Sequence, residues 1–332
     1  MYKSIDLFAG IGGIRLGFEQ AFDNIETVFV SEIDANAQKT YKANFDTPAT
    51  ISGDITIIKE EDVPAFDIML AGFPCQAFSM AGKRMGFDDD YHGVCRGTLF
   101  LDVARICEHH KPKVIFCENV KGLVSHDKGK TLNVILTTFE SIGYNVYYKV
   151  LNSKDFGVPQ NRERIYIVAF RKDIDSSEFK FPEITDNTKK LKDIIHTEKP
   201  DNKYWLSQQY VNTLKNHKER HASKGNGFGY QIREWDDIAG AVVCGGMGRE
   251  KNLIIDDRIT DFSPVGTRKT PANDECIRTL TPREWARLQG FPEDYKLILA
   301  DTALYKQFGN SVTVSVIKEI AKEIKKILEK GE

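Results

Sequence analysis

The sequence lacks the features that mark several classes of protein. None of its apolar runs approaches the roughly 18 residues that a membrane span requires. Its six cysteines include no CxxC pair and no cluster of histidines accompanies them, which argues against a zinc site and against a disulfide framework. No internal repeat or low-complexity tract is present, and the chain begins directly with a strand-like pattern. These absences predict a cytoplasmic protein with no metal and no membrane association.

Charge and composition leave the choice of partner open. The formal net charge is −2, and nucleic-acid binding depends on local basic faces rather than on the total. Hydrophobic residues make up 41% and charged residues 28%, as in ordinary globular proteins. At 332 residues the chain is long enough for a full core and for two domains.

One cysteine follows a short apolar run. Residues 67–71 (DIMLA) predict a buried strand, and Gly-Phe-Pro-Cys75 comes directly after it. Cys75 would then lie at the carboxyl end of a parallel strand, where open α/β sheets place their chemistry. Pro74 stiffens the turn that aims the thiol, and the polar, glycine-rich residues 82–97 suit a loop that closes over a substrate. A small buried thiol without function is the alternative.

A strand, a glycine turn and a helix open the chain. Residues 4–8 predict the strand, residues 9–13 (AGIGG) the turn, and an apolar stripe beginning at Ile14 the helix. Glycines in such a turn let the backbone approach a ligand closely. A dinucleotide is disfavoured, because the GxGxxG fingerprint requires glycine where this chain has Arg15.

Acidic residues follow several predicted strands. The strand over residues 27–31 leads to Glu32, which is placed to accept hydrogen bonds from ribose hydroxyls, or to stabilise a helix N-terminus. Asp54 is equally a candidate for a ligand contact and for a turn or cap. The apolar strand at residues 114–117 leads to Glu118, a position that suits a general acid or a hydrogen-bond partner.

Basic residues occur in two settings. Arg162 and Arg164 are spaced so that both share one face of a strand, either as a solvated pair or as a clamp for an anion or a substrate. Residues 171–276 are polar and weakly periodic, which predicts a separate module dominated by loops. Its basic residues at 215–224, followed by glycines and aromatics, suit phosphate contacts or a solvated charged helix.

Ordered patterning returns after residue 276. Thr281 and Pro282 predict a capped helix start, and Gly290 its end. Residues 307–312 (QFGNSV) predict the opening of a last helix, whose apolar stripe continues to Leu328.

Six motifs, in order along nearly the whole chain, resemble those of the DNA (cytosine-5)-methyltransferases, in particular the compact bacterial restriction–modification type. One such match arises easily by chance, whereas six in the family's order do not. The motifs are residues 6–13 (DLFAGIGG), 73–76 (FPCQ), 118–120 (ENV), 160–164 (QNRER), 278–292 and 309–312 (GNSV).

The resemblance implies a fold. It is the α/β, Rossmann-like mixed sheet of S-adenosylmethionine-dependent methyltransferases, with a second, smaller, loop-rich target-recognition domain. We expect residues 1–192 and 304–332 to form the catalytic and cofactor-binding domain. Residues 193–303 would form the recognition domain and leave a cleft for duplex DNA.

The resemblance also implies a reaction. Cys75 would add to C6 of cytosine, which makes C5 nucleophilic toward the methyl group of S-adenosylmethionine. Glu118 would hold the ring at N3 and the exocyclic amine, while Arg162 and Arg164 would stabilise the covalent intermediate. Because a stacked base is out of reach, the cytosine would be flipped out of the duplex, and residues 82–97 would close over it.

The same resemblance assigns the binding residues. The opening motif would contact the methionine part of S-adenosylmethionine, Glu32 the ribose, and Ile33 the adenine. The cofactor residues so assigned are Phe8, Gly10, Ile11, Gly13, Glu32, Ile33, Asp54, Ile55, Leu99, Asn310 and Val312. DNA contacts are assigned to Ser79, Lys83, Arg96, Met247 and Arg249.

The chain departs from the family pattern in two places. The loop after Cys75 is longer than in the shortest members, with the extra segment near residues 91–95. Met247 aligns with a position where some relatives carry a polar side chain that fills the gap left by the flipped base. We expect the methionine to supply apolar bulk there.

Two alternative functions fit the sequence less well. Transfer-RNA cytosine-5 methyltransferases of the same family typically carry Pro-Pro-Cys, whereas this chain has Phe-Pro-Cys75 and a larger recognition region. A catalytically inactive DNA-binding homologue is disfavoured because all four catalytic residues are present. The expected partners are double-stranded DNA and a cognate restriction endonuclease of the same site, and the chain is expected to be monomeric. The recognised sequence is not predictable, because it depends on how side chains meet base edges.

Overall fold

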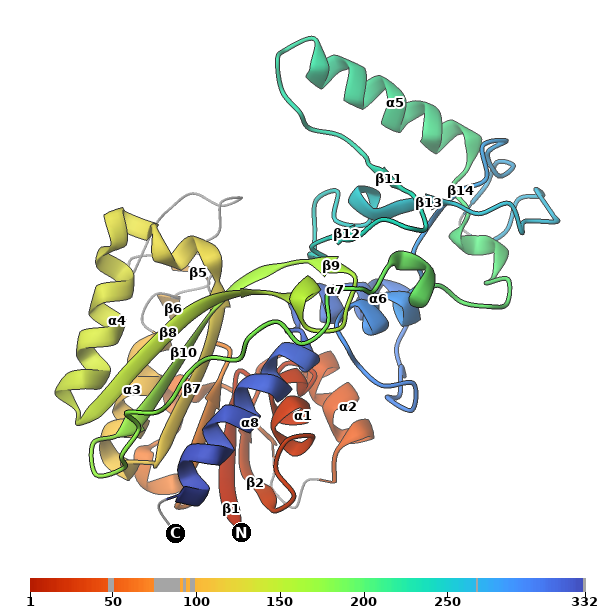
Figure 1. Ribbon diagram of the computed structural model, residues 1–332. Helices are drawn as coiled ribbons and strands as arrows, with labels where there is room; N and C mark the ends of the chain where they lie inside the picture. The colour runs from red at the N-terminus through yellow and green to blue at the C-terminus, as the bar shows by residue number, and fades with distance from the viewer. Residues whose placement is uncertain (47–50, 75–89, 92–93, 96–98, 267, 331–332) are drawn as a thin grey trace. The chain divides into compact units, whose positions relative to one another are not determined.

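The computed structural model describes residues 1–46, 51–74, 90–91, 94–95, 99–266 and 268–330 (Figure 1). Its contacts divide the chain into two compact units, each assembled from separate stretches of sequence. The first unit comprises Met1–Asn152, Glu163–Thr185 and Val312–Glu332, and the second comprises Ser153–Arg162 and Asp186–Ser311. The domain boundaries at 192 and 304 stay a prediction.

A seven-stranded sheet forms the centre of the first unit, in the order β3-β2-β1-β4-β7-β10-β8. The strands from β3 to β7 are parallel, whereas β10 is antiparallel to both β7 and β8. The predicted mixed sheet is therefore confirmed. The strands are β1 (Tyr2–Leu7), β2 (Ile25–Ser31), β3 (Ile51–Ser52), β4 (Ile68–Ala71), β7 (Val114–Val120), β8 (Tyr144–Asn152) and β10 (Glu163–Arg171).

Helices cover both faces of this sheet (Figure 1). Successive side chains of a strand point to opposite faces, so Ile5 and Leu7 face α3 and α4, whereas Asp6 faces α1 and α2. On that second face, Gly17 of α1 packs directly on Ile317 of α8. A short hairpin, β5 (Asp90–Tyr91) with β6 (Val94–Cys95), completes this unit. Its helices are α1 (Gly13–Glu19), α2 (Ala35–Asn44), α3 (Leu99–His110), α4 (Lys130–Ser141) and α8 (Val314–Lys330).

Apart from the 15-residue helix α5, the second unit is built mostly from short elements. Its three-stranded sheet has the order β11-β13-β14, and β9 pairs with β12. The strands are β9 (Gln160–Asn161), β11 (Ile232–Arg233), β12 (Ala239–Gly240), β13 (Leu253–Ile255) and β14 (Ile277–Thr279). The helices are α5 (Gln208–Ala222), α6 (Pro282–Leu288) and α7 (Asp301–Asn310).

Two predicted helix starts have different outcomes. Helix α6 begins as expected, because Thr281 and Glu284 form a reciprocal capping box with Pro282 between them. The prediction that residues 307–312 open the last helix is wrong, since residues 307–310 are the end of α7. Helix α7 forms by packing on α6, where the rings of Trp285 and Tyr305 meet edge to face, and such a contact leaves no local signal.

No helix in the described part of the chain is long and apolar enough to cross a membrane.

Candidate functional site

The turn after β1 is fastened to the carboxylate that follows β2. The Gly10 N–H donates to Glu32 Oε2 at 2.7 Å, and the Asp34 N–H donates to Glu32 Oε1 at 2.7 Å. Gly10 has a φ of 55°, and a Cβ added there would meet no atom within 4 Å, so the turn has open space on that side. Burial raises the pKa of Glu32 even though these N–H groups oppose the shift. Asp34, not Glu32, caps α2, because its side chain accepts from the first N–H groups of that helix.

The residues around this turn fit a ligand with a ribose and a flat apolar group. Ile33 stands next to Glu32 with 73% of its surface exposed, which is unusual for an isoleucine and leaves an apolar face free. Asp54 accepts from the Thr56 N–H and hydroxyl, so it caps a short turn of 3₁₀ helix. Ile55 is buried in the core, where Leu99 packs against the same cluster. Carboxylate, open glycine turn and exposed isoleucine together suit S-adenosylmethionine.

An ion pair joins β7 and β10 where the carboxyl end of β7 lies beside the start of β10. Arg164 Nε of β10 is 3.3 Å from Glu118 Oε1 of β7, and their side chains are only 15% and 12% exposed. The neighbouring Asn119 donates through Nδ2 to the Phe73 carbonyl oxygen at 3.4 Å. The predicted glutamate motif is thereby tied to the backbone of the predicted nucleophile motif.

Arg162 has other contacts than Arg164. It lies between β9 and β10, is 3% exposed, and donates to the backbone oxygens of Val242 and Ser311 at 2.6 Å each. Both acceptors belong to the second unit. Arg162 therefore lies outside the strand that carries Arg164, and the two arginines have different partners.

The predicted catalytic cysteine, Cys75, lies outside the described residues, as do three of the predicted DNA contacts, Ser79, Lys83 and Arg96. Met247 is half-buried against a small apolar cluster of the second unit, which includes Leu214 of α5 and Leu253 of β13. The guanidinium of Arg249, another predicted DNA contact, lies over the Tyr305 ring at 5.3 Å. Of the predicted cofactor residues, exposed Asn310 accepts from Cys244 Sγ at 2.6 Å, and Val312 is buried.

A buried polar group next to the glycine turn was not predicted from the sequence. Asp6 of β1 is 1% exposed, and Oδ2 accepts from the Tyr41 hydroxyl of α2 at 3.1 Å. Tyr41 in turn accepts from Arg15 Nη1 at 3.2 Å. A carboxylate inside an otherwise apolar strand was the only available signal, since its partners lie far away in the sequence.

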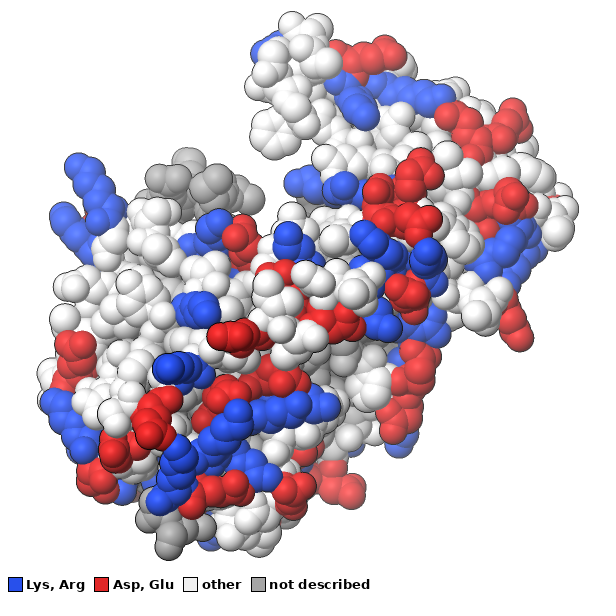
Figure 2. Space-filling model, viewed as in Figure 1, with Lys and Arg blue, Asp and Glu red and all other residues white. Residues whose placement is uncertain are grey.

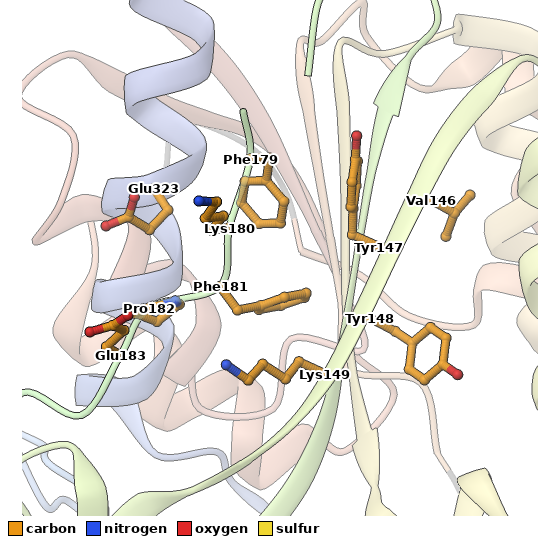
Figure 3. Close-up of a pocket in the computed structure, with 10 residues that line it drawn as sticks. All are labelled: Val146, Tyr147, Tyr148, Lys149, Phe179, Lys180, Phe181, Pro182, Glu183 and Glu323. Carbon is orange, nitrogen blue, oxygen red and sulfur yellow. The ribbon is translucent and has the colours of Figure 1, made fainter. Parts of the chain in front are cut away.

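A cavity of about 590 Å³ lies elsewhere in the first unit, between β8 and α8 (Figure 3). Tyr147, Phe179 and Phe181 line it, and the rings of Phe179 and Tyr147 pack at 5.2 Å. Among the described residues, none of the predicted site residues lines this cavity. On the visible face of the molecule, basic and acidic side chains are intermixed (Figure 2).

Comparison with known proteins finds similarity to one family along nearly the whole chain. The model of the family described as C-5 cytosine-specific DNA methylase matches residues 2–326. The Type II methyltransferase M.HpaII of Haemophilus parainfluenzae is 54% identical over 334 residues, which cover 99% of this chain and 90% of that protein. M.HhaI of Haemophilus parahaemolyticus is 38% identical and covers 97% of this chain and 94% of its own.

Solved structures support the fold. The S. pombe Dnmt2 methyltransferase superposes with a TM-score of 0.74 at 20% identity and covers 100% of both chains. That identity speaks for the fold alone, whereas the family match and the close relatives speak for the activity. The chain therefore belongs to the C-5 cytosine-specific DNA methylase family and is a DNA (cytosine-5)-methyltransferase of the bacterial restriction–modification type.

Proposed function

We propose that this enzyme methylates C5 of a cytosine that is flipped out of a short, specific double-stranded DNA sequence, through a covalent bond between Cys75 and C6. The observation that carries the proposal is the shielded pair of Glu118 and Arg164, with Asn119 next to it holding the Phe73 carbonyl. Cys75 follows Phe73 by two residues in the sequence.

The chemistry explains why these groups are needed. C5 of cytosine is a weak nucleophile until the Cys75 thiolate bonds to C6 and turns the ring into an enamine. S-adenosylmethionine supplies the electrophilic methyl group. Loss of the C5 proton and expulsion of the thiolate then restore the aromatic ring. Attack at C6 and methyl transfer to C5 both require access to the faces of the cytosine ring, which base flipping provides.

Glu118 and the arginines act on charge and position. Glu118 would bind N3 and the exocyclic amine, so that it stabilises the charge that appears on the ring after attack. Arg164 would fix the direction of that carboxylate and contact the base. Arg162 would act through the backbone oxygens of Val242 and Ser311, which it holds in the second unit. Removing one such electrostatic contact typically lowers kcat by about 10²–10³.

The cofactor would be held by the turn after β1. Glu32 would accept hydrogen bonds from the ribose hydroxyls, and the exposed Ile33 would pack on the adenine. Asp54 and Ile55 would contact the adenine edge, while Phe8, Gly10, Ile11 and Gly13 would face the methionine part. Glu32→Gln should raise the Kd for S-adenosylhomocysteine by about tenfold, because a charged hydrogen bond contributes about 1.5–3 kcal/mol. Leu99, Asn310 and Val312 complete the proposed contacts.

The test is sequencing of plasmid DNA from cells that express the chain, after bisulfite conversion. Wild type and the matched control Cys276→Ser should methylate one short motif at C5, whereas Cys75→Ser should not, with cofactor binding intact. Methylation by Cys75→Ser would refute the covalent mechanism. Unmodified DNA with methylated transfer RNA would favour the transfer-RNA alternative.

The biological role proposed is protection of host DNA, with a restriction endonuclease of the same site as the partner. Methylated plasmid should then resist an endonuclease that cuts the motif found by sequencing, and plasmid from Cys75→Ser cells should be cut. The chain is proposed to act as a monomer on DNA. Ser79, Lys83, Arg96, Met247 and Arg249 are its proposed DNA contacts.

A further inference from the structure

Helix α5 of the second unit (Figure 1) has a basic side that no acidic group in the described part of the chain neutralises. His217, Arg220 and His221 are spaced so that they share this side of the helix. Lys224 follows in the turn directly after α5, where its N–H donates to the His221 carbonyl oxygen at 3.1 Å. The Arg220 and Lys224 side chains are exposed, and neither forms an ion pair with another described residue. At neutral pH these two cations therefore supply most of the charge of the basic side.

The other charged residues of α5 lie elsewhere on the helix. Lys215 pairs with Glu275 at 2.5 Å, so its charge is already balanced. Glu219 is the only acidic residue of α5 and comes directly before Arg220 in the sequence. Consecutive residues of a helix are turned by about 100° around its axis, so Glu219 points away from the basic side. The positive charge on that side is thus left for a partner outside the unit.

An exposed aromatic ring is held beside these cations. Phe228 is 64% exposed, and its ring meets that of His221 edge to face, with 5.9 Å between the centroids. The centroid of the His221 ring lies 4.4 Å from that of His217. A Cβ added at Gly229 would lie 2.8 Å from Lys218 Cγ, so the segment that carries Phe228 runs closely along α5. The surface therefore offers both free positive charge and an apolar ring.

Contacts within the second unit connect α5 to a residue that is proposed to contact DNA. Met247 packs against an apolar cluster that contains Leu214 of α5 and Tyr230. With a rise of about 1.5 Å per residue, Lys224 is at most about 15 Å from Leu214 along the helix axis. A duplex covers the same length in about five base pairs, since successive base pairs are about 3.4 Å apart. That is the distance from a contacted base to phosphates just outside a short recognised sequence.

We propose that the basic side of α5 binds backbone phosphates of the duplex beside the recognised sequence, and so anchors the second unit on DNA without reading bases. The inference rests on the proposed function, because it assigns a further contact to the same duplex. Arg220 and Lys224 supply the charge, and Phe228 lies against the sugars. Each cation displaces a counterion condensed on the DNA, so the contact adds affinity that is independent of sequence and falls as the salt concentration rises.

The test measures the Kd of the full chain at several salt concentrations for two duplexes. One carries the motif found by plasmid sequencing, and the other has the same composition with that motif scrambled. In the double variant Arg220→Gln/Lys224→Gln, the plot of log association constant against log salt concentration should be less steep by about 1.8, because each lost phosphate contact removes about 0.9. Binding should then be about 30-fold weaker than that of the wild type at about 0.15 M salt, and equal to it near about 1 M. The ratio of the two Kd values should not change, because phosphate contacts carry no sequence information.

Two further double variants serve as controls. Lys322→Gln/Lys326→Gln removes the same charge from α8, where each lysine pairs with a glutamate at 2.7 Å, and it should keep the wild-type slope. Arg220→Lys/Lys224→Arg exchanges the two cations and should also keep that slope, because counterion release depends on the charge rather than on the shape of the side chain.

The outcomes separate the inference from the proposed function. An unchanged slope in Arg220→Gln/Lys224→Gln would overturn the inference and leave the proposed function standing, since the two cations would then only favour the dipole at the C-terminus of α5. A changed Kd ratio would also overturn it, because the side chains would then read bases. If the wild-type protein bound neither duplex, the inference and the proposed function would both fail.

Discussion

Arg164 Nε of β10 lies 3.3 Å from Glu118 Oε1 of β7, and both side chains are almost withdrawn from solvent. The strands are antiparallel, with Tyr166 opposite Glu118 and Arg164 opposite Val120. The pair is thus a diagonal contact between adjacent strands, and the rigid sheet sets its geometry. A site that must bind a ring edge at two atoms gains from a carboxylate that is held in this way.

Arg164→Lys should lower kcat for methylation by about 10²–10³ and leave the Kd for DNA unchanged. Lysine keeps the charge but lacks the planar fork, so the Glu118 carboxylate loses its fixed direction. Methyl transfer from labelled cofactor under single-turnover conditions measures the effect. The control is Arg171→Lys on the same strand, because Arg171 forms an exposed pair with Asp173. An unchanged single-turnover rate in Arg164→Lys would show that the pair only stabilises the fold.

Gly17→Ala should lower the free energy of unfolding, although alanine is the better helix former. The substitution gains about 1 kcal/mol of helix propensity. However, the new Cβ would lie 2.6 Å from Ile317 Cβ and 3.1 Å from the Lys318 backbone nitrogen, neither of which can rotate away. Overpacking of this kind costs about 1–3 kcal/mol, so we expect a net loss. Urea unfolding measures it, with Gly53→Ala as the control, since no atom lies within 4 Å of a Cβ there.

How far the sequence predicts this molecule depends on how local each signal is. The apolar runs at residues 67–71 and 114–117 predicted β4 and β7, because buried parallel strands need apolar side chains on both faces. For the segment that forms α5, a charged helix was one of two interpretations, the other being a phosphate-contacting surface. The apolar signal was weak because Val211 and Leu214 are the only buried residues of this mostly polar helix. The bond between Asp6 and Tyr41 spans 35 residues and left no pattern to detect. The mixed sheet and the family could be predicted, whereas contacts between distant polar groups could not.

Asp256 should make the stability of the protein fall in strong acid. Burial alone would raise the pKa of its carboxyl, but hydrogen bonds from Arg258 and Arg278 lower it to about 2. A carboxyl with a lowered pKa in the folded state adds stability that is fully present above its unfolded pKa of about 3.9. That contribution is lost as the pH falls from about 4 to 2.

Urea unfolding of the wild type and of Asp256→Asn at several pH values measures this contribution. The difference between the two should be largest near pH 7 and should shrink between pH 4 and pH 2. Because Arg278 is fully buried between Asp256 and Glu284, removing one charge near neutral pH should cost about 3–5 kcal/mol. A constant difference across this range would mean that the ionisation of Asp256 is not what stabilises the cluster. Asp236→Asn, at an exposed pair with Lys192, serves as the control.

Gly309→Ala should disturb the second unit more than its small size suggests. A Cβ at Gly309 of α7 would overlap the backbone of Val243 and Cys244, and backbone atoms cannot move aside as the end of a flexible side chain can. The helix and the segment at residues 242–244 must then separate, which also strains the contact of Cys244 Sγ with Asn310 Oδ1. We expect a loss of about 1–3 kcal/mol in the free energy of unfolding. Faster labelling of the exposed Cys244 thiol should accompany that loss.

Gly227→Ala is the matched control, because no atom lies within 4 Å of its added Cβ. Labelling of the native protein, read by peptide mass spectrometry at Cys244, separates a local opening from global unfolding, in which the buried Cys107 and Cys117 would react as well. Because Asn310 is a proposed cofactor contact, the Kd for S-adenosylhomocysteine should also rise in Gly309→Ala. Normal stability together with normal labelling would show that α7 and residues 242–244 are not held by this close approach.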